Sequence, residues 1–577
     1  MIAWWEKYIF SSDNALFRLF VVVRLANALF IRTFFQADEY WQALEPAHYV
    51  AFGYGELTWE WRTGLRSYLF PFIFEMGYRF VKVISMLCRY SLDSLVDSPN
   101  FTTRIEYVGV IYVPRVIMAV VAAIGDYYTV KLAHKVFSST VVVPKNGKIN
   151  MPKQLLSAKI VTAFIVTINF FNWYFSTRSF INSFEMTLTT VALYFWDWDS
   201  GDAVKSKHFT FSLIFGILAC FLRPSNGLIW AILGWFLLIN LFLRRSFTLI
   251  FLVLFKVLFS FAVVFLMNTI IDYYFYGYLT FPLFKFIKFN FTTPLSQFYG
   301  VAPWHFHIFQ SLPFLLGGYL AFFICGLCMI PFPNVANSKF LTPLHQFRLV
   351  TVINIIVYSS LAHKEFRFVY PLRPFFTIIA AYGILIVQAR PPFGIKFKHV
   401  INTVSTVILL LSLFAGMYLT YINESGVIDV MKFLHYEPNI NSLGMLMPCH
   451  STPWQSYLHR NDIDSLWAIS CEPPLHLLND PHAAEKLPLY MDESDYLYAD
   501  TPRFIGQHFP PISDKTASTV SYDHSWPEYL VLFEHLNNLY MKDYLEHTNY
   551  VEYKRFFNSY SHWDSRRSGD IIVYRQN

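Results

Sequence analysis

Three acidic side chains gather in one short polar segment that follows the first apolar run of the chain. The segment, residues 36–48, contains Asp38, Glu39 and Glu45. If it is helical, Asp38, Gln42 and Glu45 share one face, because residues four and seven positions apart align on a helix. A carboxylate at a membrane–water boundary is partly desolvated, which raises its basicity and suits a general base. Acids that only favour the first turn of a solvated helix produce the same pattern.

Aromatic rings and a basic residue accompany these acids. Trp41 lies within the acidic segment, and Trp59 and Arg66 follow in two short aromatic stretches. Tryptophan rings near carboxylates suit the faces of sugars, and arginine suits phosphate. An aromatic belt with interfacial arginines is the alternative interpretation.

Two further arginines, Arg178 and Arg223, stand in very short hairpins between apolar runs. The orientation derived below places both on the lumenal side, where arginine runs against the usual charge bias of membrane proteins. An anionic phosphate ligand would explain them. Pairing with Glu185 or with an interfacial headgroup explains them equally well.

A second ionisable cluster lies much later, at 361–368. Its charged side chains are His363, Lys364, Glu365 and Arg367. The cluster offers cations to a leaving phosphate, and a His–Glu pair that can orient a substrate hydroxyl. Trp304 and His305, in the loop 299–307, add to the same face.

The composition excludes several classes of protein. Of 577 residues, 55% are hydrophobic and only 15% charged, whereas soluble domains carry about 25% charged residues. The mean hydropathy is +0.37, which excludes a disordered chain, a coiled coil and a simple soluble enzyme. A net charge of +6 is too small to suggest nucleic-acid binding.

The six cysteines are too few for a disulfide framework. Cys325 and Cys328 have CxxC spacing but lie in an apolar run, which favours packing over redox or zinc chemistry. Cys449 and Cys471 can pair if the tail lies in an oxidising compartment.

About eleven apolar runs approach the roughly 20 residues that a membrane helix needs. Their approximate limits are 15–35, 107–131, 156–175, 178–197, 208–222, 224–243, 247–271, 308–331, 346–361, 370–389 and 398–421. The run at 67–88 is interrupted by charges and predicts an interfacial helix. We therefore expect an all-α polytopic membrane domain, 1–421, with a long first lumenal loop, 36–106. A lumenal soluble α/β domain, 422–577, should follow.

Positive charge in the short loops predicts a cytosolic N-terminus, a first run retained as a signal anchor, and a lumenal tail. The basic residues assigned to the cytosol are Lys135, Lys145, Lys148, Lys153, Arg244, Arg245, Lys339, Arg390, Lys396 and Lys398. Three Asn-x-Ser/Thr sequons, at Asn100, Asn290 and Asn423, all fall on the lumenal side and are candidate glycosylation sites.

Taken together, these motifs resemble glycosyltransferase family 22, the multi-span GT-C mannosyltransferases of the endoplasmic reticulum. The segments that carry the resemblance are 38–42, 57–61, 65–68, 177–178, 182–185, 223–224, 303–305 and 363–368. The tail segments 447–453, 471–474 and 492–495 are similar to the subgroup that adds the third mannose to glycosylphosphatidylinositol (GPI) precursors. The family usually has His or Asn, then Pro, before the acidic pair, where this chain has Gln36-Ala37.

The resemblance implies a GT-C fold and transfer of mannose, in α-1,2 linkage with inversion, from dolichyl-phosphate-mannose to a two-mannose GPI precursor. Within this scheme we expect Asp38 to act as the base, and Glu39 to act as a second acid or as an orienting group. The expected donor phosphate ligands are Arg178, Arg223, His363, Lys364 and Arg367. The expected substrate-binding residues are Trp41, Glu45, Trp59, Arg66, Trp304, His305 and Glu365. No cofactor and no obligatory metal are expected, since fixed cations can neutralise the phosphate.

Three alternatives remain at this stage. The first is another family 22 mannosyltransferase, acting on dolichyl oligosaccharide or adding a different GPI mannose. The second is a lipid transporter or scramblase, which predicts ionisable residues in mid-membrane; Arg115, Asp126 and Lys256 lie nominally within spans. The third is a structural subunit, which would not need acids and cations clustered on one face.

Overall fold

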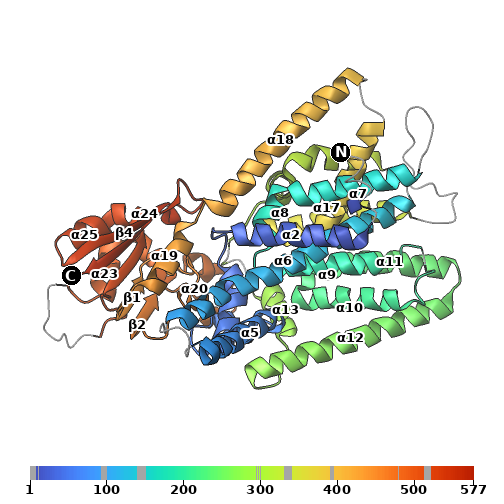
Figure 1. Ribbon diagram of the computed structural model, residues 1–577. Coiled ribbons are helices and arrows are strands. Elements are labelled where there is room, and N and C mark those ends of the chain that lie inside the picture. The colour runs from blue at the N-terminus through green and yellow to red at the C-terminus, as the bar shows by residue number, and fades with distance from the viewer. Residues whose placement is uncertain are drawn as a thin grey trace.

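A computed structural model shows a long helical body with a small sheet-containing domain at one end, where the C-terminus also lies (Figure 1). The structure describes residues 8–10, 12–92, 100–139, 151–199, 201–293, 295, 298, 300–330, 341–389, 395–478, 480–512 and 521–577. Four residues used for the orientation, Lys145, Lys148, Lys339 and Arg390, lie outside this part of the chain.

Each of the predicted apolar runs coincides with helical structure. The helices are α2 (Asp13–Phe30), α6 (Asn100–Ser138), α7 (Met151–Ile168), α8 (Phe170–Phe175), α9 (Ile181–Phe195), α10 (Lys207–Leu222), α11 (Gly227–Leu243), α12 (Phe247–Tyr276), α14 (Leu312–Leu316), α15 (Leu320–Met329), α16 (Pro343–Ser360), α17 (Arg373–Ala389) and α18 (Ile395–Tyr421). Most run side by side, whereas α18 diverges from the body (Figure 1).

Within the described residues, six helical segments are long and apolar enough to cross a membrane. They are Thr103–Ser138, Pro224–Leu243, Phe247–Tyr276, His307–Met329, Phe366–Ala389 and Thr403–Tyr436. Other predicted spans are short; α9 has 15 residues and α10 has 16. The chain is a multi-pass membrane protein, and the count of about eleven spans stays a prediction.

The long segment 36–106, predicted as the first lumenal loop, is largely helical. It contains the π-helix η1 (Tyr40–Leu44), then α3 (Glu45–Phe52), α4 (Trp59–Arg62) and α5 (Leu69–Leu92). The run predicted to lie at the interface forms α5, which buries Phe74 and Tyr78 and exposes Phe80 and Met86. This two-faced burial suits a helix that rests partly on the body and partly on lipid. The segment after α12 contains a further helix, α13 (Pro282–Thr292).

The sheet of the C-terminal domain has five strands in the order β2-β1-β3-β5-β4. They are β1 (Ser442–Met445), β2 (Ser465–Ala468), β3 (Tyr529–Phe533), β4 (Tyr550–Ser559) and β5 (Gly569–Gln576). β1 is parallel to β2 and β3, and β5 is antiparallel to β3 and β4. Every residue of β3 is buried, as expected for a central strand covered on both faces. The chief helices are α19 (Gly426–Tyr436), α20 (Gln455–Leu458), α22 (Glu493–Ala499), α23 (Thr501–His508) and α25 (Lys542–Glu546).

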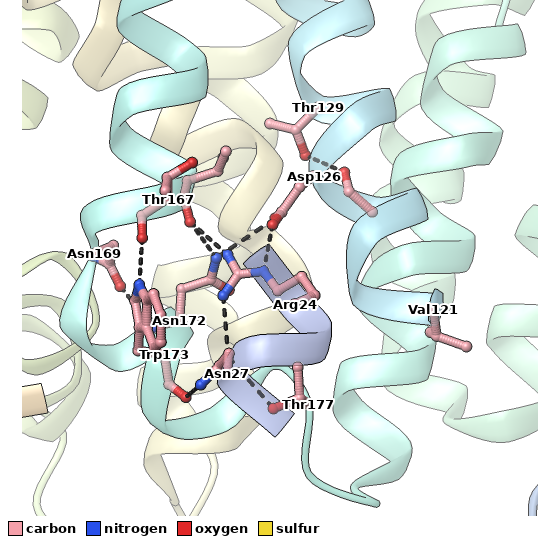
Figure 2. Close-up of polar contacts among 12 residues, drawn as sticks. Arg24, Asn27, Val121, Asp126, Thr129, Thr167, Asn169, Asn172, Trp173 and Thr177 are labelled. Atoms are coloured by element: carbon pink, nitrogen blue, oxygen red, sulfur yellow. Dashed lines mark hydrogen bonds and ion pairs between the residues drawn. The ribbon is translucent and has the colours of Figure 1, made fainter. Parts of the chain in front are cut away.

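A buried ionic network joins the helices of the body. Arg24 on α2 donates from Nε to Asp126 Oδ2 on α6 at 2.6 Å, and Arg373 on α17 donates from Nη2 to Asp126 Oδ1 at 2.7 Å. Arg24 also donates to the side chain of Asn27 and to the carbonyl of Val166 (Figure 2). Buried charges must be paired, so this carboxylate fixes two helices to a third. The network thereby joins α2 and α17 to α6, and one ionisable cluster follows α2 while the other precedes α17.

We predict that Asp126→Ala lowers the free energy of unfolding by about 3–5 kcal/mol, because it leaves two buried guanidinium groups without their carboxylate. Thermal unfolding of the detergent-solubilised protein measures this. Asp13→Ala is the matched control, since Asp13 pairs with Lys131 at the surface with its side chain 50% exposed, and should cost no more than about 1 kcal/mol. Equal melting temperatures for the two variants would contradict the prediction.

Candidate active site

The two ionisable clusters meet in space through Asp38 and Arg367, which are 329 positions apart and form an ion pair. Arg367 also grips Glu365 with two donors, Nε to Oε2 and Nη2 to Oε1, both at 2.7 Å. His363 Nε2 lies 3.1 Å from Glu365 Oε1. Acid and base thus alternate along one continuous chain of contacts.

Local backbone structure places both ends of this pair. Asp38 lies in the first turn of a helix that leads into η1, and this turn is closed by the amide of Trp41, which donates to the carbonyl of Ala37 at 2.9 Å. Arg367 lies in the 3-10 helix η6 (Phe366–Leu372), directly before α17. The Asp126 network thus fixes α2 and α17, the helices next to the two segments that carry the pair.

A pocket lies against this ion pair, and both Asp38 and Arg367 belong to its lining. Its polar lining consists of Asp38, Gln42, Arg66, Ser67, Arg223 and Arg367. Its remaining walls are mainly apolar, with the rings of Phe70, Phe180 and Phe286 among them. Three guanidinium groups and one carboxylate therefore face the same space.

Each of the other two pocket arginines has an acid behind it. Arg66 donates to Glu60 at 2.6 Å, and its guanidinium lies 5.5 Å from the Phe286 ring. Arg223 Nε lies 3.9 Å from Glu185 Oε2, with its guanidinium 5.0 Å from the Phe368 ring. Planar guanidinium groups stacked on rings and backed by acids are well suited to hold an anion.

The ion pairs also set the charge of the second cluster. Burial alone raises the pKa of Glu365, but Arg367 and His363 outweigh this effect and hold the pKa below its usual range. Burial lowers the pKa of His363, and the contacts with Glu365 reverse this to a net rise. Glu365 is therefore an anion that holds Arg367 and His363 in place.

Two predicted site residues lie behind the pocket rather than in its lining. Arg178 is 1% exposed and donates to Glu39 Oε2 at 3.1 Å and to the carbonyl of Thr33 at 2.6 Å. Its Nε donates to the carbonyl of Tyr174 at 2.7 Å. Burial raises the pKa of Glu39, and Arg178 opposes this rise. The pair anchors the segment that carries Asp38.

Lys364 and His363 likewise support a neighbouring loop. Lys364 Nζ donates to the carbonyl of Ala302 at 2.7 Å, and His363 Nδ1 lies 2.9 Å from the carbonyl oxygen of Gly300. Burial lowers the pKa of Lys364. The loop they hold presents Trp304, which is 66% exposed, with His305 beside it. None of these side chains lines the pocket.

Three predicted substrate-binding residues contact other parts of the chain. The Trp41 indole donates to the carbonyl of Thr452 at 3.1 Å. Glu45 accepts from the backbone amides of Trp454 and Ser456 at 2.8 and 3.2 Å, and burial raises its pKa to about 7. Trp59 packs against Phe289, 5.6 Å between ring centroids. Of the predicted substrate-binding residues, Arg66 alone lines the pocket, where Trp61, Leu65 and Ser67 from the same stretch accompany it.

Several pocket residues carry no signal in the sequence. Phe70, Phe180 and Phe286 belong to a chain with 60 phenylalanines, and nothing in their spacing distinguishes them. The helical spacing places Gln42 on the same face as Asp38, and Gln42 does line the pocket.

The modification and cysteine predictions have mixed outcomes. Asn290 is exposed on α13, Asn423 is half-buried, and Asn100 begins α6; their glycosylation stays a prediction. Cys325 and Cys328 are free thiols on α15. Cys449 and Cys471 form a disulfide. Among the described residues, the one group with metal-ligand spacing is these two cysteines with His450, and its sulfurs bond to each other.

A helical membrane body with a charged pocket beside a smaller domain is the arrangement of a membrane glycosyltransferase. The fold matches ArnT from Cupriavidus metallidurans, in the crystal structure bound to undecaprenyl phosphate, with a TM-score of 0.52 over 97% of both chains at 11% sequence identity. This likeness shows a GT-C fold and confirms the fold predicted from the sequence, apart from the number of spans.

The family model for Alg9-like mannosyltransferases matches residues 15–459, so the chain belongs to the Alg9-like mannosyltransferase family. It is 49% identical to GPI mannosyltransferase 3 of Saccharomyces cerevisiae over 97% of this chain and 95% of that protein. Identity is 48% to GPI mannosyltransferase 3 of Candida glabrata, over 99% and 97% of the chains. It is 47% to that of Kluyveromyces lactis, over 97% and 98%. The family resemblance seen in the sequence is confirmed.

We predict that Arg178→Ala destabilises the protein by about 3–5 kcal/mol, because Glu39 then stays buried without its counter-ion. Thermal unfolding in detergent tests this, with Arg62→Ala as control, since the Arg62 side chain is 61% exposed in its pair with Glu472. A variant that melts like the control and instead shows a higher KM for a substrate would restore Arg178 as a ligand.

Proposed function

We propose that this enzyme transfers the third mannose of the GPI anchor, in α-1,2 linkage, from dolichyl-phosphate-mannose to a precursor that carries two mannoses. The observation that carries the chemical part is the convergence of Asp38 with Arg66, Arg223 and Arg367 on one pocket. The family match and the names of the relatives support the reaction class and the acceptor.

In the proposed step, Asp38 removes the proton from the acceptor hydroxyl while the oxygen of that hydroxyl bonds to C1 of the mannosyl group. The bond between C1 and the phosphate oxygen breaks, and its electron pair leaves with dolichyl phosphate. Attack on the face opposite the phosphate inverts the anomeric centre. A positioned carboxylate of this kind contributes about 10²- to 10⁴-fold to the rate.

Arg367 is proposed to serve both ends of the reaction. Its ion pair with Asp38 places a cation between the base and the space that Arg223 also faces. As the proton reaches Asp38, negative charge disappears from the carboxylate and develops on the phosphate. Arg367 can follow this shift without moving, which is the preorganised stabilisation that favours a transition state. Glu365 keeps the guanidinium in that position.

Three guanidinium groups supply the charge that a divalent metal would otherwise provide, so we propose a reaction without a metal or other cofactor. We place the enzyme in the endoplasmic reticulum membrane, with the pocket and the C-terminal domain in the lumen and the N-terminus in the cytosol. The lumenal sequons and the basic residues of the opposite loops support this orientation.

The transporter alternative is less well supported. The mid-membrane acid Asp126 is fully engaged by Arg24 and Arg373 within the body, and Arg115 donates to the carbonyl of Ile31 and to Tyr457. Such internal pairing suits a structural role better than a path for a charged substrate.

We predict that Asp38→Asn lowers the transfer rate by at least about 10²-fold while the protein still inserts and folds, because the amide cannot accept the proton. Membranes supplied with dolichyl-phosphate-mannose and a two-mannose acceptor, in the presence of EDTA, provide the assay. Asp462→Asn is the control, since Asp462 pairs with Arg460 with its side chain 61% exposed. Full activity of Asp38→Asn would exclude this residue as the base, and activity lost on adding EDTA to the native enzyme would exclude a metal-free reaction.

The position of the mannose is tested separately by removing the protein from cells and identifying the lipid that accumulates. We expect a GPI precursor with two mannoses. Accumulation of a dolichyl oligosaccharide, or of a GPI precursor with one or three mannoses, would assign the enzyme to a different step.

A further inference from the structure

The loop that follows β1 in the C-terminal domain forms a socket for Trp41, three residues after Asp38. We define the Trp41 socket as Cys449, His450, Thr452 and Trp454. The indole N–H donates to the carbonyl of Thr452 at 3.1 Å, the His450 ring lies 4.5 Å from the Trp41 ring, and Trp454 lies 6.0 Å away. Trp41 is only 7% exposed as a result.

The socket is also held by contacts that do not involve the Trp41 side chain. The Cys449–Cys471 disulfide closes its base, and Arg567 donates to the carbonyl of Cys449 at 3.2 Å. Glu45 binds the backbone amide of Trp454 at 2.8 Å. His450 adopts φ = 52°, a left-handed conformation that is uncommon for residues other than glycine. A non-glycine residue held in this region by its surroundings is characteristic of sites where position matters.

Trp41 and Asp38 belong to the same helical turn. The amide of Trp41 and the amide of Tyr40 both donate to the carbonyl of Ala37, at 2.9 Å, so the turn that carries Asp38 is closed by Trp41 itself. The carbonyl of Trp41 accepts from the Trp61 indole at 3.0 Å. A shift of the Trp41 backbone would therefore also shift the helical turn that carries the Asp38 carboxylate.

The electrostatics agree with this proximity. Burial and Arg567 lower the pKa of His450 to about 4, and the Asp38 carboxylate opposes them. The ring is thus neutral at physiological pH and close enough to feel the charge of Asp38, so it can pack beside that carboxylate without replacing Arg367 as its partner.

We propose that the C-terminal domain positions the base of the transfer reaction, with the Trp41 socket holding Trp41 and thereby the turn that carries Asp38. His450 and Trp41 are then positioning residues, not substrate contacts. The inference rests on the proposed role of Asp38. A misplacement of about 1 Å at a reacting group can cost 10²-fold in rate, so loss of the socket should reduce kcat and leave binding intact.

The test compares His450→Ala, His450→Phe and the control His547→Ala in the full-length enzyme, with kcat and both KM values measured. His547 is exposed at the end of α25 in the same domain. We expect His450→Ala to lose at least tenfold in kcat with each KM within about twofold. His450→Phe keeps a ring against Trp41 and should recover most of that loss, and His547→Ala should match the native enzyme.

Native kcat in His450→Ala, or a loss that lies entirely in KM, would overturn the proposal. If His450→Ala does not accumulate, Trp41→Phe decides the question, because it keeps an aromatic ring in the socket but is smaller and cannot donate the hydrogen bond to Thr452. It should lower kcat about threefold or more at unchanged KM, and native kcat would again overturn the proposal. An inactive Asp38→Asn beside a fully active His450→Ala would refute the socket alone, whereas an active Asp38→Asn would refute the proposed function.

Discussion

The ion pair between Asp38 and Arg367 organises the candidate site, because it joins two segments that are 329 positions apart in the chain. Other ion pairs hold each partner in position. The pair of Glu39 and Arg178 anchors the Asp38 segment, and Glu365 grips Arg367 with both carboxylate oxygens. Below them, the Asp126 network fixes the helices from which both segments emerge.

The same arrangement explains how several arginines remain close to one another near a membrane. A buried cation without a partner is costly, and the structure provides a separate acid for each pocket arginine, namely Glu60, Glu185 and Glu365. These acids approach from behind, so the pocket still presents three guanidinium groups. Arginine suits this role better than lysine, because its planar fork binds an acid on one edge and an anion on another.

The sequence predicted the helical body, the sheet domain and the two ionisable clusters, since these depend on composition, periodicity and local charge. It could not separate Arg178 from Arg223, which stand in similar short hairpins between apolar runs. Only the tertiary fold turns the first inward to Glu39 and leaves the second in the pocket lining.

Glu45 lies away from the pocket lining for a definable reason. The helix does begin at Asp38, but residues Tyr40–Leu44 form a π-helix, which has more residues in each turn than an α-helix. The change in helical phase keeps Gln42 at the pocket and directs Glu45 to the C-terminal domain. Amphipathic spacing alone does not reveal such a local departure.

We propose that a single pocket holds both the base and the phosphate of the lipid donor. A structure of the enzyme with dolichyl phosphate, the product of the proposed reaction, would test this arrangement. We expect phosphate oxygens within about 3 Å of the guanidinium nitrogens of Arg223 and Arg367. The Asp38 carboxylate should lie across the space that a mannosyl group would occupy. A phosphate bound elsewhere, with Asp38 separated from it by protein or by the width of the bilayer, would show that the base and the phosphate do not share a pocket.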